Sequence, residues 1–106
     1  MRSSHSVFLS REAEDDVRQI AEYTAENWGE DHADEYVDEI LAAIGALRQY
    51  PRRGNAYPAI PDLYWFPVRD YSVFYRVQRQ DVEIVRIIHQ RRNLTAQLKD
   101  LQEPGS

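Results

Sequence analysis

The chain has 106 residues, of which 42% are hydrophobic and 29% charged, and it contains no cysteine. That length suits one folded domain, and the missing cysteine excludes disulfides, thiol nucleophiles and cysteine-based metal centres. No apolar run reaches the roughly 20 residues of a membrane span, and none follows residues 1–5 as the core of a secretory signal. We therefore expect a single domain over residues 1–106, with its core at about 6–101, located in the cytoplasm.

Charge is divided unevenly between the two halves of the chain, although the net charge is only −5. Residues 1–50 carry twelve Asp or Glu against four Arg, whereas residues 51–106 carry nine Lys or Arg against six acids. The second half is therefore the predicted surface for an anionic partner. In the first half, the solvated outer face of two amphipathic helices explains the acids equally well.

The first half of the chain predicts a strand followed by a helical hairpin. A β-type run at residues 6–9 leads directly into a helix that Ser10 is expected to cap. Gly29 is expected to end this helix with a positive φ, and a second helix is predicted from about Asp31 to the stop at Pro51. Because the connection is so short, the two helices must be antiparallel neighbours.

Each predicted helix has an apolar and a polar face. In the first helix Ala13, Val17 and Ile20 recur at steps of three or four, which indicates that this stripe packs inward. Residues between them, Asp15 and Asp16 included, are expected to face water. In the second helix Gly45 is expected at a close backbone contact.

The second half predicts a loop and an antiparallel meander. Residues 51–62 hold three prolines and show no periodicity, which is typical of an irregular loop. Three β-type runs joined by hairpin-length connections follow, at residues 63–68, 71–78 and 82–89. The last run is apolar on both sides of its alternation and suits a central strand, and spaced leucines at 94–101 predict a short C-terminal helix.

This order of elements predicts an α+β domain. The helical hairpin is expected to pack on one face of an antiparallel sheet of three to four strands, and the N-terminal strand and the short C-terminal helix complete the fold. No second layer of helices is predicted. The other face of the sheet is therefore expected to stay partly open, and binding is expected on a concave face beside the arginine-rich turns.

In this order and spacing the residues resemble the RelE/ParE toxin superfamily, and its ParE-like branch most closely, over about residues 7–98. The resemblance rests on residues 13–20, Tyr23, Trp28-Gly29, Tyr50-Pro51, Gly54, residues 71–77, the hydrophobic residues Val82, Ile84 and Val85, and residues 86–93. It implies the toxin component of a type II toxin-antitoxin system, neutralised by a ParD-like antitoxin that covers it. It also implies a target, because ParE-like toxins act on DNA gyrase and RelE-like toxins cut messenger RNA on the ribosome.

The chemistry of RNA cleavage distinguishes the two branches, since it needs a base, an acid and a cation that stabilises the phosphate. RelE-like toxins carry lysines on the strand entering the meander, an Arg after the Tyr of the next strand, and an Arg and a Tyr near the C-terminus. Here residues 64–68 contain no lysine, Ser72 follows Tyr71, and residues 93–98 contain no Tyr. We therefore expect a gyrase-binding toxin without catalytic residues, with a ribosome-dependent endoribonuclease or a non-toxic, antitoxin-binding relative as alternatives.

Guanidinium groups are the candidates for target binding, since they bind carboxylate or phosphate in bidentate fashion. The predicted target-binding residues, for gyrase or nucleic acid, are Arg52, Arg53, Arg69, His89, Arg91 and Arg92. For His89 a structural role at the end of a buried strand is the alternative. Arg86 is instead expected to pair with a buried carboxylate, either Asp16 or Asp70.

The predicted antitoxin-binding residues are the aromatic side chains Tyr23, Trp28 and Tyr36 of the hairpin. An amphipathic antitoxin segment is expected to lie along the hairpin and reach the sheet, with Tyr36 as the position for which a purely structural role is the main alternative. The three histidines lie far apart in the sequence and on different predicted elements. We therefore expect no metal site, no cofactor and no membrane partner.

Overall fold

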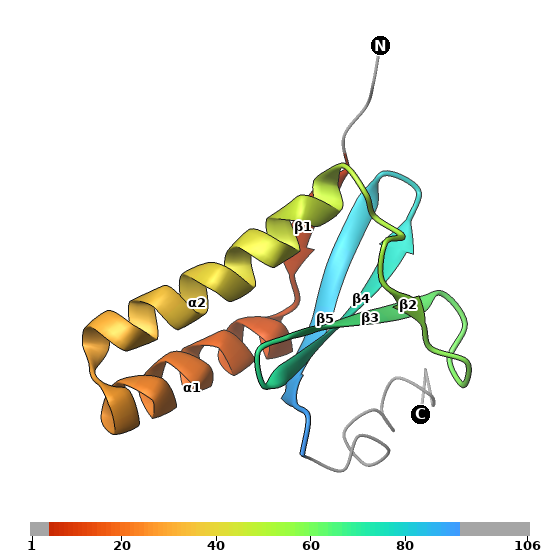
Figure 1. Ribbon diagram of the computed structural model, residues 1–106. Helices are drawn as coiled ribbons and strands as arrows, with labels where there is room; N and C mark the ends of the chain where they lie inside the picture. Colours follow the sequence, from red (N-terminus) through yellow and green to blue (C-terminus); the bar gives the residue numbers. More distant parts are fainter. Residues whose placement is uncertain (1–4, 92–106) are drawn as a thin grey trace.

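The computed structural model describes residues 5–91 and confirms the α+β class (Figure 1). The first half forms β1 (Ser6–Leu9), α1 (Arg11–Trp28), α2 (Glu30–Gly45) and the 3-10 turn η1 (Ala46–Arg48). The second half forms β2 (Asn55–Ala56), β3 (Leu63–Val68), β4 (Tyr71–Gln78) and β5 (Asp81–His89). The C-terminal helix predicted at 94–101 lies outside the described residues.

The strands form one mixed sheet in the order β1-β5-β4-β3-β2. β5 lies between β1 and β4 as a central strand, as its apolar sequence predicts. Two features differ from the expected antiparallel sheet of three to four strands. β1 pairs with β5 in parallel, and the two-residue β2, within the predicted loop, adds a fifth strand antiparallel to β3. The residues of β1 and β5 are far apart in sequence, and the two residues of β2 are too few to show an alternating pattern, so no local pattern predicts either pairing.

The helix ends follow local backbone chemistry. The Ser10 hydroxyl accepts a 3.0 Å hydrogen bond from the Ala13 N–H, and Gly29 has φ 95°, both as predicted. α2 ends at Gly45 and not at Pro51, because η1 takes over its last turn and buries Leu47. The close backbone contact expected at Gly45 is wrong, since an added Cβ would meet only the end of the flexible Arg48 side chain, at 3.1 Å.

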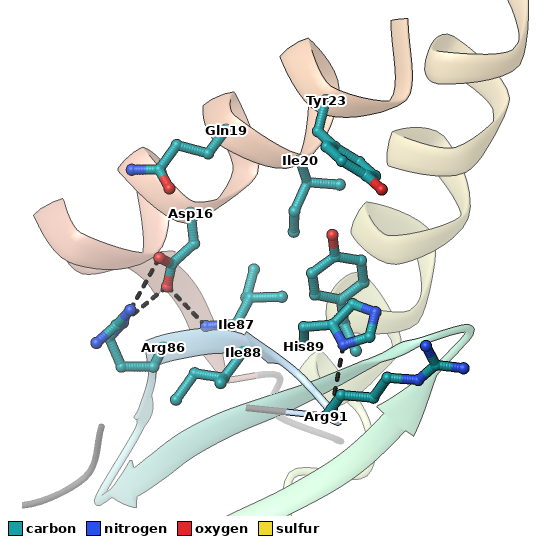
Figure 2. A pocket seen from close by; sticks show the side chains of 10 residues that line it. Asp16, Gln19, Ile20, Tyr23, Arg86, Ile87, Ile88, His89 and Arg91 are labelled. Carbon is teal, nitrogen blue, oxygen red and sulfur yellow. Dashed lines mark hydrogen bonds and ion pairs between the residues drawn. The ribbon is translucent and has the colours of Figure 1, made fainter. Parts of the chain in front are cut away.

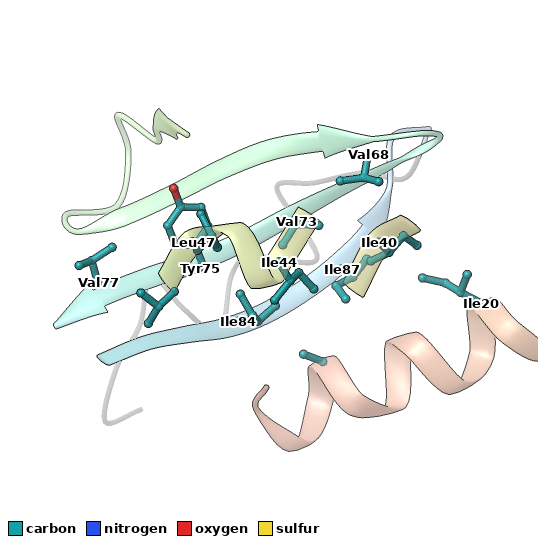
Figure 3. Packing of buried hydrophobic residues seen from close by; sticks show 12 residues of the cluster. Ile20, Ile40, Ile44, Leu47, Val68, Val73, Tyr75, Val77, Ile84 and Ile87 are labelled. Carbon is teal, nitrogen blue, oxygen red and sulfur yellow. The ribbon is translucent and has the colours of Figure 1, made fainter. Parts of the chain in front are cut away.

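The main core fills the space between the hairpin and the sheet (Figure 3). α1 contributes Ile20, α2 contributes Ile40 and Ile44, and the sheet contributes residues such as Tyr75 and Ile87. Burial of these side chains is the main force that holds the hairpin against the strands.

A second cluster lies apart from the hairpin core. It comprises Ile60, Leu63, Phe74, Val85 and Ile88, with Tyr57 and Trp65 packed against it. Ile60 and Tyr57 come from the loop between β2 and β3. The face expected to stay open is therefore partly covered by this loop.

A bulge in β5 decides which of its side chains face the hairpin. Phe74 pairs with Arg86 and Tyr75 with Ile84, so Val85 has no partner on β4. The extra residue shifts the alternation by one position. Ile84 and Ile87 therefore both join the hairpin core, while Val85 and Ile88 join the second cluster.

Gly54 is the glycine at which the backbone approaches its surroundings closely. Its N–H donates a 3.0 Å hydrogen bond to the phenolic oxygen of the fully buried Tyr75. A Cβ at this position would lie 2.7 Å from that oxygen and 2.8 Å from the Trp65 carbonyl oxygen. We expect Gly54→Ala to lower the free energy of unfolding by about 1–3 kcal/mol, because the backbone carbonyl cannot move away easily.

Urea unfolding followed by circular dichroism measures the change. Gly45→Ala is the matched control, because Gly45 is helical and the added methyl meets only a flexible side chain. This control should be neutral or more stable by up to about 1 kcal/mol. Equal stability losses in both variants would contradict the assignment.

Candidate functional site

A pocket of about 810 Å³ opens where α1 passes the end of β5; we call it the β5 pocket (Figure 2). It is lined by Asp16, Gln19, Ile20, Tyr23, Tyr71, Arg86, Ile87, Ile88, His89 and Arg91. The α1 residues recur at steps of three or four, so they form one face of that helix. The pocket therefore has one helical wall, one strand edge and a mouth that carries His89 and Arg91.

Asp16 joins the two walls of this pocket. Its carboxylate accepts hydrogen bonds from the Arg86 Nε at 2.8 Å, the Arg86 Nη2 at 3.1 Å and the Ile87 backbone N–H at 2.8 Å (Figure 2). The side chain is buried, so the expectation that Asp16 faces water is wrong. Position 16 lies three residues after Ala13 and four before Ile20, which places it on the buried stripe.

Arg86 is therefore an internal residue of the fold, as predicted from its place in the last strand. Of the two carboxylates expected as its partner, Asp16 is the one that it contacts. Asp70 instead accepts a 3.2 Å hydrogen bond from the Tyr36 hydroxyl. Two bonds from one guanidinium to a buried carboxylate fix the relative position of α1 and β5.

His89 and Arg91 are held next to each other at the mouth of the pocket. The Nδ1 of His89 accepts a 3.1 Å hydrogen bond from the Arg91 backbone N–H, and its ring meets Tyr71 edge to face at 5.1 Å. Gln90 fastens this end of β5, because its N–H donates to the Asp70 carbonyl oxygen at 2.8 Å. Hydrogen bonds from the backbone N–H groups of Gln90 and Arg91 thus hold this end of β5 in place at the mouth of the pocket.

An aromatic ladder runs from His89 to the turn between β3 and β4. Tyr71 meets the ring of Tyr36 at 6.2 Å, and the Arg69 guanidinium lies over the Tyr36 ring at 5.3 Å. Burial is the main cause that raises the pKa of Tyr36, so its hydroxyl stays protonated at neutral pH. Arg69 also pairs with Glu39 at 2.9 Å, and this hydrogen bond raises the pKa of Arg69.

A second pocket of about 510 Å³ lies on the other side of α2, between that helix and β3; we call it the β3 pocket. Its lining includes the cations Arg53 and Arg69 and the apolar residues Phe66, Pro67 and Val68. The β5 pocket and the β3 pocket both carry arginines, and the aromatic ladder leads from the first towards the second.

The predicted site residues divide between these places. His89 and Arg91 share the β5 pocket with Tyr23, whereas Arg53 and Arg69 line the β3 pocket. Arg52 is exposed and lines neither, and Arg92 lies outside the described residues.

The other two aromatic candidates lie elsewhere on the hairpin. Trp28 is 68% exposed at the turn between the helices, where it contacts the ring of His32 at 6.0 Å. Tyr36 is bonded within the chain through Asp70.

Seven lining residues were not among the sequence candidates for binding, namely Asp16, Gln19, Ile20, Tyr71, Arg86, Ile87 and Ile88. The first three lie at spacings from Tyr23 that share a helix face, and that periodicity is the signal from which they could have been found. Within residues 5–91 no group of three or more His, Asp or Glu is placed to hold a metal ion. In the same range no helix is both long and apolar enough to cross a membrane.

The fold defines a small α+β protein in which a helical hairpin packs on a mixed five-stranded sheet, the architecture expected of a RelE/ParE-like toxin. A family model described as "ParE toxin of type II toxin-antitoxin system, parDE" matches residues 7–94. This chain belongs to that family, and it is a toxin of a type II toxin-antitoxin system.

Curated relatives agree with this assignment. The "Toxin ParE1" of Mycobacterium tuberculosis is 31% identical over 97 residues, covering 90% of this chain and 99% of the relative. The "Toxin ParE1" of Caulobacter vibrioides is 34% identical over 91 residues, covering 85% and 94%. A solved structure titled "Chromosomal ParDE TA system from P. aeruginosa" shares the fold with a TM-score of 0.72 at 23% identity, covering 80% of this chain and 95% of that one.

Removal of the Asp16 carboxylate should destabilise the fold. In Asp16→Ala the Ile87 N–H and the Arg86 guanidinium lose their buried partner, so we expect a loss of at least about 2 kcal/mol in the free energy of unfolding. Asp15→Ala is the matched control, since its ion pair with Arg18 is exposed and should contribute no more than about 0.5 kcal/mol. Chemical denaturation of both variants measures the difference, and equal effects would show that Asp16 does not anchor α1.

Proposed function

We propose that this toxin inhibits DNA gyrase by binding to it, and that a ParD-like antitoxin neutralises it by covering the same surface. One observation carries the proposal. The β5 pocket brings Tyr23, the predicted antitoxin contact, together with His89 and Arg91, the predicted target contacts. A partner that covers Tyr23 would also cover His89 and Arg91, so neutralisation needs no conformational change.

The positions at which RelE-like nucleases carry catalytic cations hold other residues in this chain, and this favours binding over RNA cleavage. Ser72 stands where such a toxin has an Arg, and it is 4% exposed within β4, between Pro67 on β3 and Ile88 on β5. Residues 64–68 of β3 offer aromatic and apolar side chains in place of lysines. Ser72 and residues 64–68 therefore supply no cation to stabilise a phosphate during cleavage, and Arg91 or Arg92 is the one cation of the RelE-like pattern that this chain retains.

The β5 pocket and the β3 pocket suit an extended anionic partner. Arg91 at the β5 pocket and Arg53 at the β3 pocket are exposed, and within residues 5–91 neither takes part in an ion pair. Guanidinium groups in such positions bind carboxylates of a protein or phosphates of its DNA. Action on gyrase would place the toxin in the cytoplasm.

Purified toxin should inhibit the supercoiling activity of gyrase or trap cleaved DNA. We expect Arg91→Glu to weaken the inhibition at least about 10-fold, because it reverses the charge at the pocket mouth. Arg79→Glu is the matched control, since Arg79 is an exposed arginine of the turn at the other end of β5. The proposal is wrong if the toxin leaves gyrase unaffected and cleaves ribosome-bound messages. Normal growth of cells that express the toxin without antitoxin would indicate a non-toxic relative.

Antitoxin binding should depend on Tyr23. A ParD-like antitoxin that co-purifies with the toxin is the partner for this test. We expect Tyr23→Ala to raise its Kd at least about 10-fold, since a 61% exposed aromatic side chain at a pocket is typical of an interface anchor. Tyr50→Ala is the matched control, because Tyr50 is 63% exposed and lies outside the pocket. Calorimetry measures both, and the assignment is wrong if Tyr23→Ala and Trp28→Ala both bind like the wild type.

A further inference from the structure

The edge of β5 loses its strand neighbour halfway along its length. β1 pairs with residues 81–84 of β5 and stops at Leu9. The chain then turns into α1 at Ser10, whose N–H donates to the Ile84 carbonyl oxygen at 2.9 Å and whose hydroxyl donates to the Val85 carbonyl oxygen at 3.0 Å. From Arg86 onwards the α1 side of β5 has no paired strand among the described residues.

Backbone groups on this edge of β5 point outward, as they would towards a neighbouring strand. The Ile87 N–H points away from β4 and donates to Asp16, and the Gln90 N–H points the other way, to the Asp70 carbonyl oxygen. Since strand backbone alternates direction, the Ile87 C=O and the His89 N–H also lie on the α1 side. No residue between 5 and 91 bonds to either group. Both belong to residues that line the β5 pocket.

The opposite edge of the sheet is protected from strand pairing. The Leu63 carbonyl oxygen on the outer edge of β3 accepts a hydrogen bond from the Tyr57 N–H. Every second residue of a strand directs its backbone groups to the same side, so those of Trp65 and Pro67 also point outward, away from β4. Beyond the two-residue β2 the next outward position is Pro67, which has no N–H to offer. An added strand would therefore be favoured at β5 and disfavoured at β3.

We propose that an extended segment of the antitoxin enters the β5 pocket and pairs as a short strand with the edge at Ile87 and His89. This inference rests on the proposed function and specifies how the antitoxin binds. It differs from a helix laid along the hairpin, because main-chain hydrogen bonds supply part of the affinity.

The chemistry of the pocket defines the side chains of that segment. An apolar residue faces Ile20 and Tyr23 on the helical wall, and a carboxylate faces His89 and Arg91 at the mouth. A segment of about three residues is long enough, since strands rise about 3.3 Å per residue. The occupant is therefore a short acidic and apolar peptide in extended form.

Hydrogen exchange in the full toxin-antitoxin complex tests the backbone pairing. The His89 amide should exchange at least 10-fold more slowly in the complex than in the free toxin, as measured by NMR. The Ile87 amide is the internal control, because Asp16 already binds it in the free protein. An unchanged His89 amide in a fully formed complex overturns the inference and leaves the proposed function standing.

A scan of antitoxin peptides distinguishes strand from helix. Methylation of one backbone nitrogen at a time should weaken binding at least 10-fold at alternate residues, whereas a docked helix would show losses without that alternation. On the toxin, Gln19→Trp should fill the pocket and weaken binding at least 10-fold, with the exposed Gln80→Trp in the turn between β4 and β5 as the matched control. If toxin and antitoxin do not associate at all, the proposed function fails together with this inference.

Discussion

The bond between Asp16 and the backbone of β5 is the constraint on which the working end of this molecule depends. α1 starts where β1 stops, so the edge of β5 loses its neighbour at that point. Asp16 supplies an acceptor for the Ile87 N–H, and its charge is balanced by Arg86. A buried carboxylate with these partners is stable, whereas one without them would be costly. Beyond this contact Gln19 and Tyr23 line the pocket between helix and strand.

The bulge at Val85 determines how the end of β5 faces α1. With regular alternation Ile84 and Ile87, three residues apart, would face opposite sides of the sheet. The bulge lets both join the hairpin core, while the following residues carry His89 to the side of Tyr71. The same irregularity thus completes the core and orients the pocket mouth.

Local sequence chemistry predicted most of the elements, because their causes lie within a few residues. The Ser10 cap, the Gly29 turn and the meander of β3, β4 and β5 are examples. The parallel pairing of β1 with β5 was not predictable, since the two strands lie far apart along the chain. The strand β2 was not predictable because two residues show no alternating pattern. Asp16 was named correctly as one of two candidate partners of Arg86, but its helix face was wrong because charge was weighed above its spacing from Ala13 and Ile20. Its partner on β5 is 70 residues away.

The arginines differ in whether they form ion pairs within the fold, and this decides which of them can bind a partner. Arg86 is paired with a buried carboxylate, and its displacement would leave Asp16 without its countercharge. Arg69 pairs with Glu39 at the surface, where both side chains are about half exposed, so a stronger anionic partner can replace that contact at little cost. Arg52, Arg53 and Arg91 make no ion pair within residues 5–91. The hairpin carboxylates therefore leave Arg91 at the β5 pocket and Arg53 at the β3 pocket open to an external partner, although the net charge of the chain is negative.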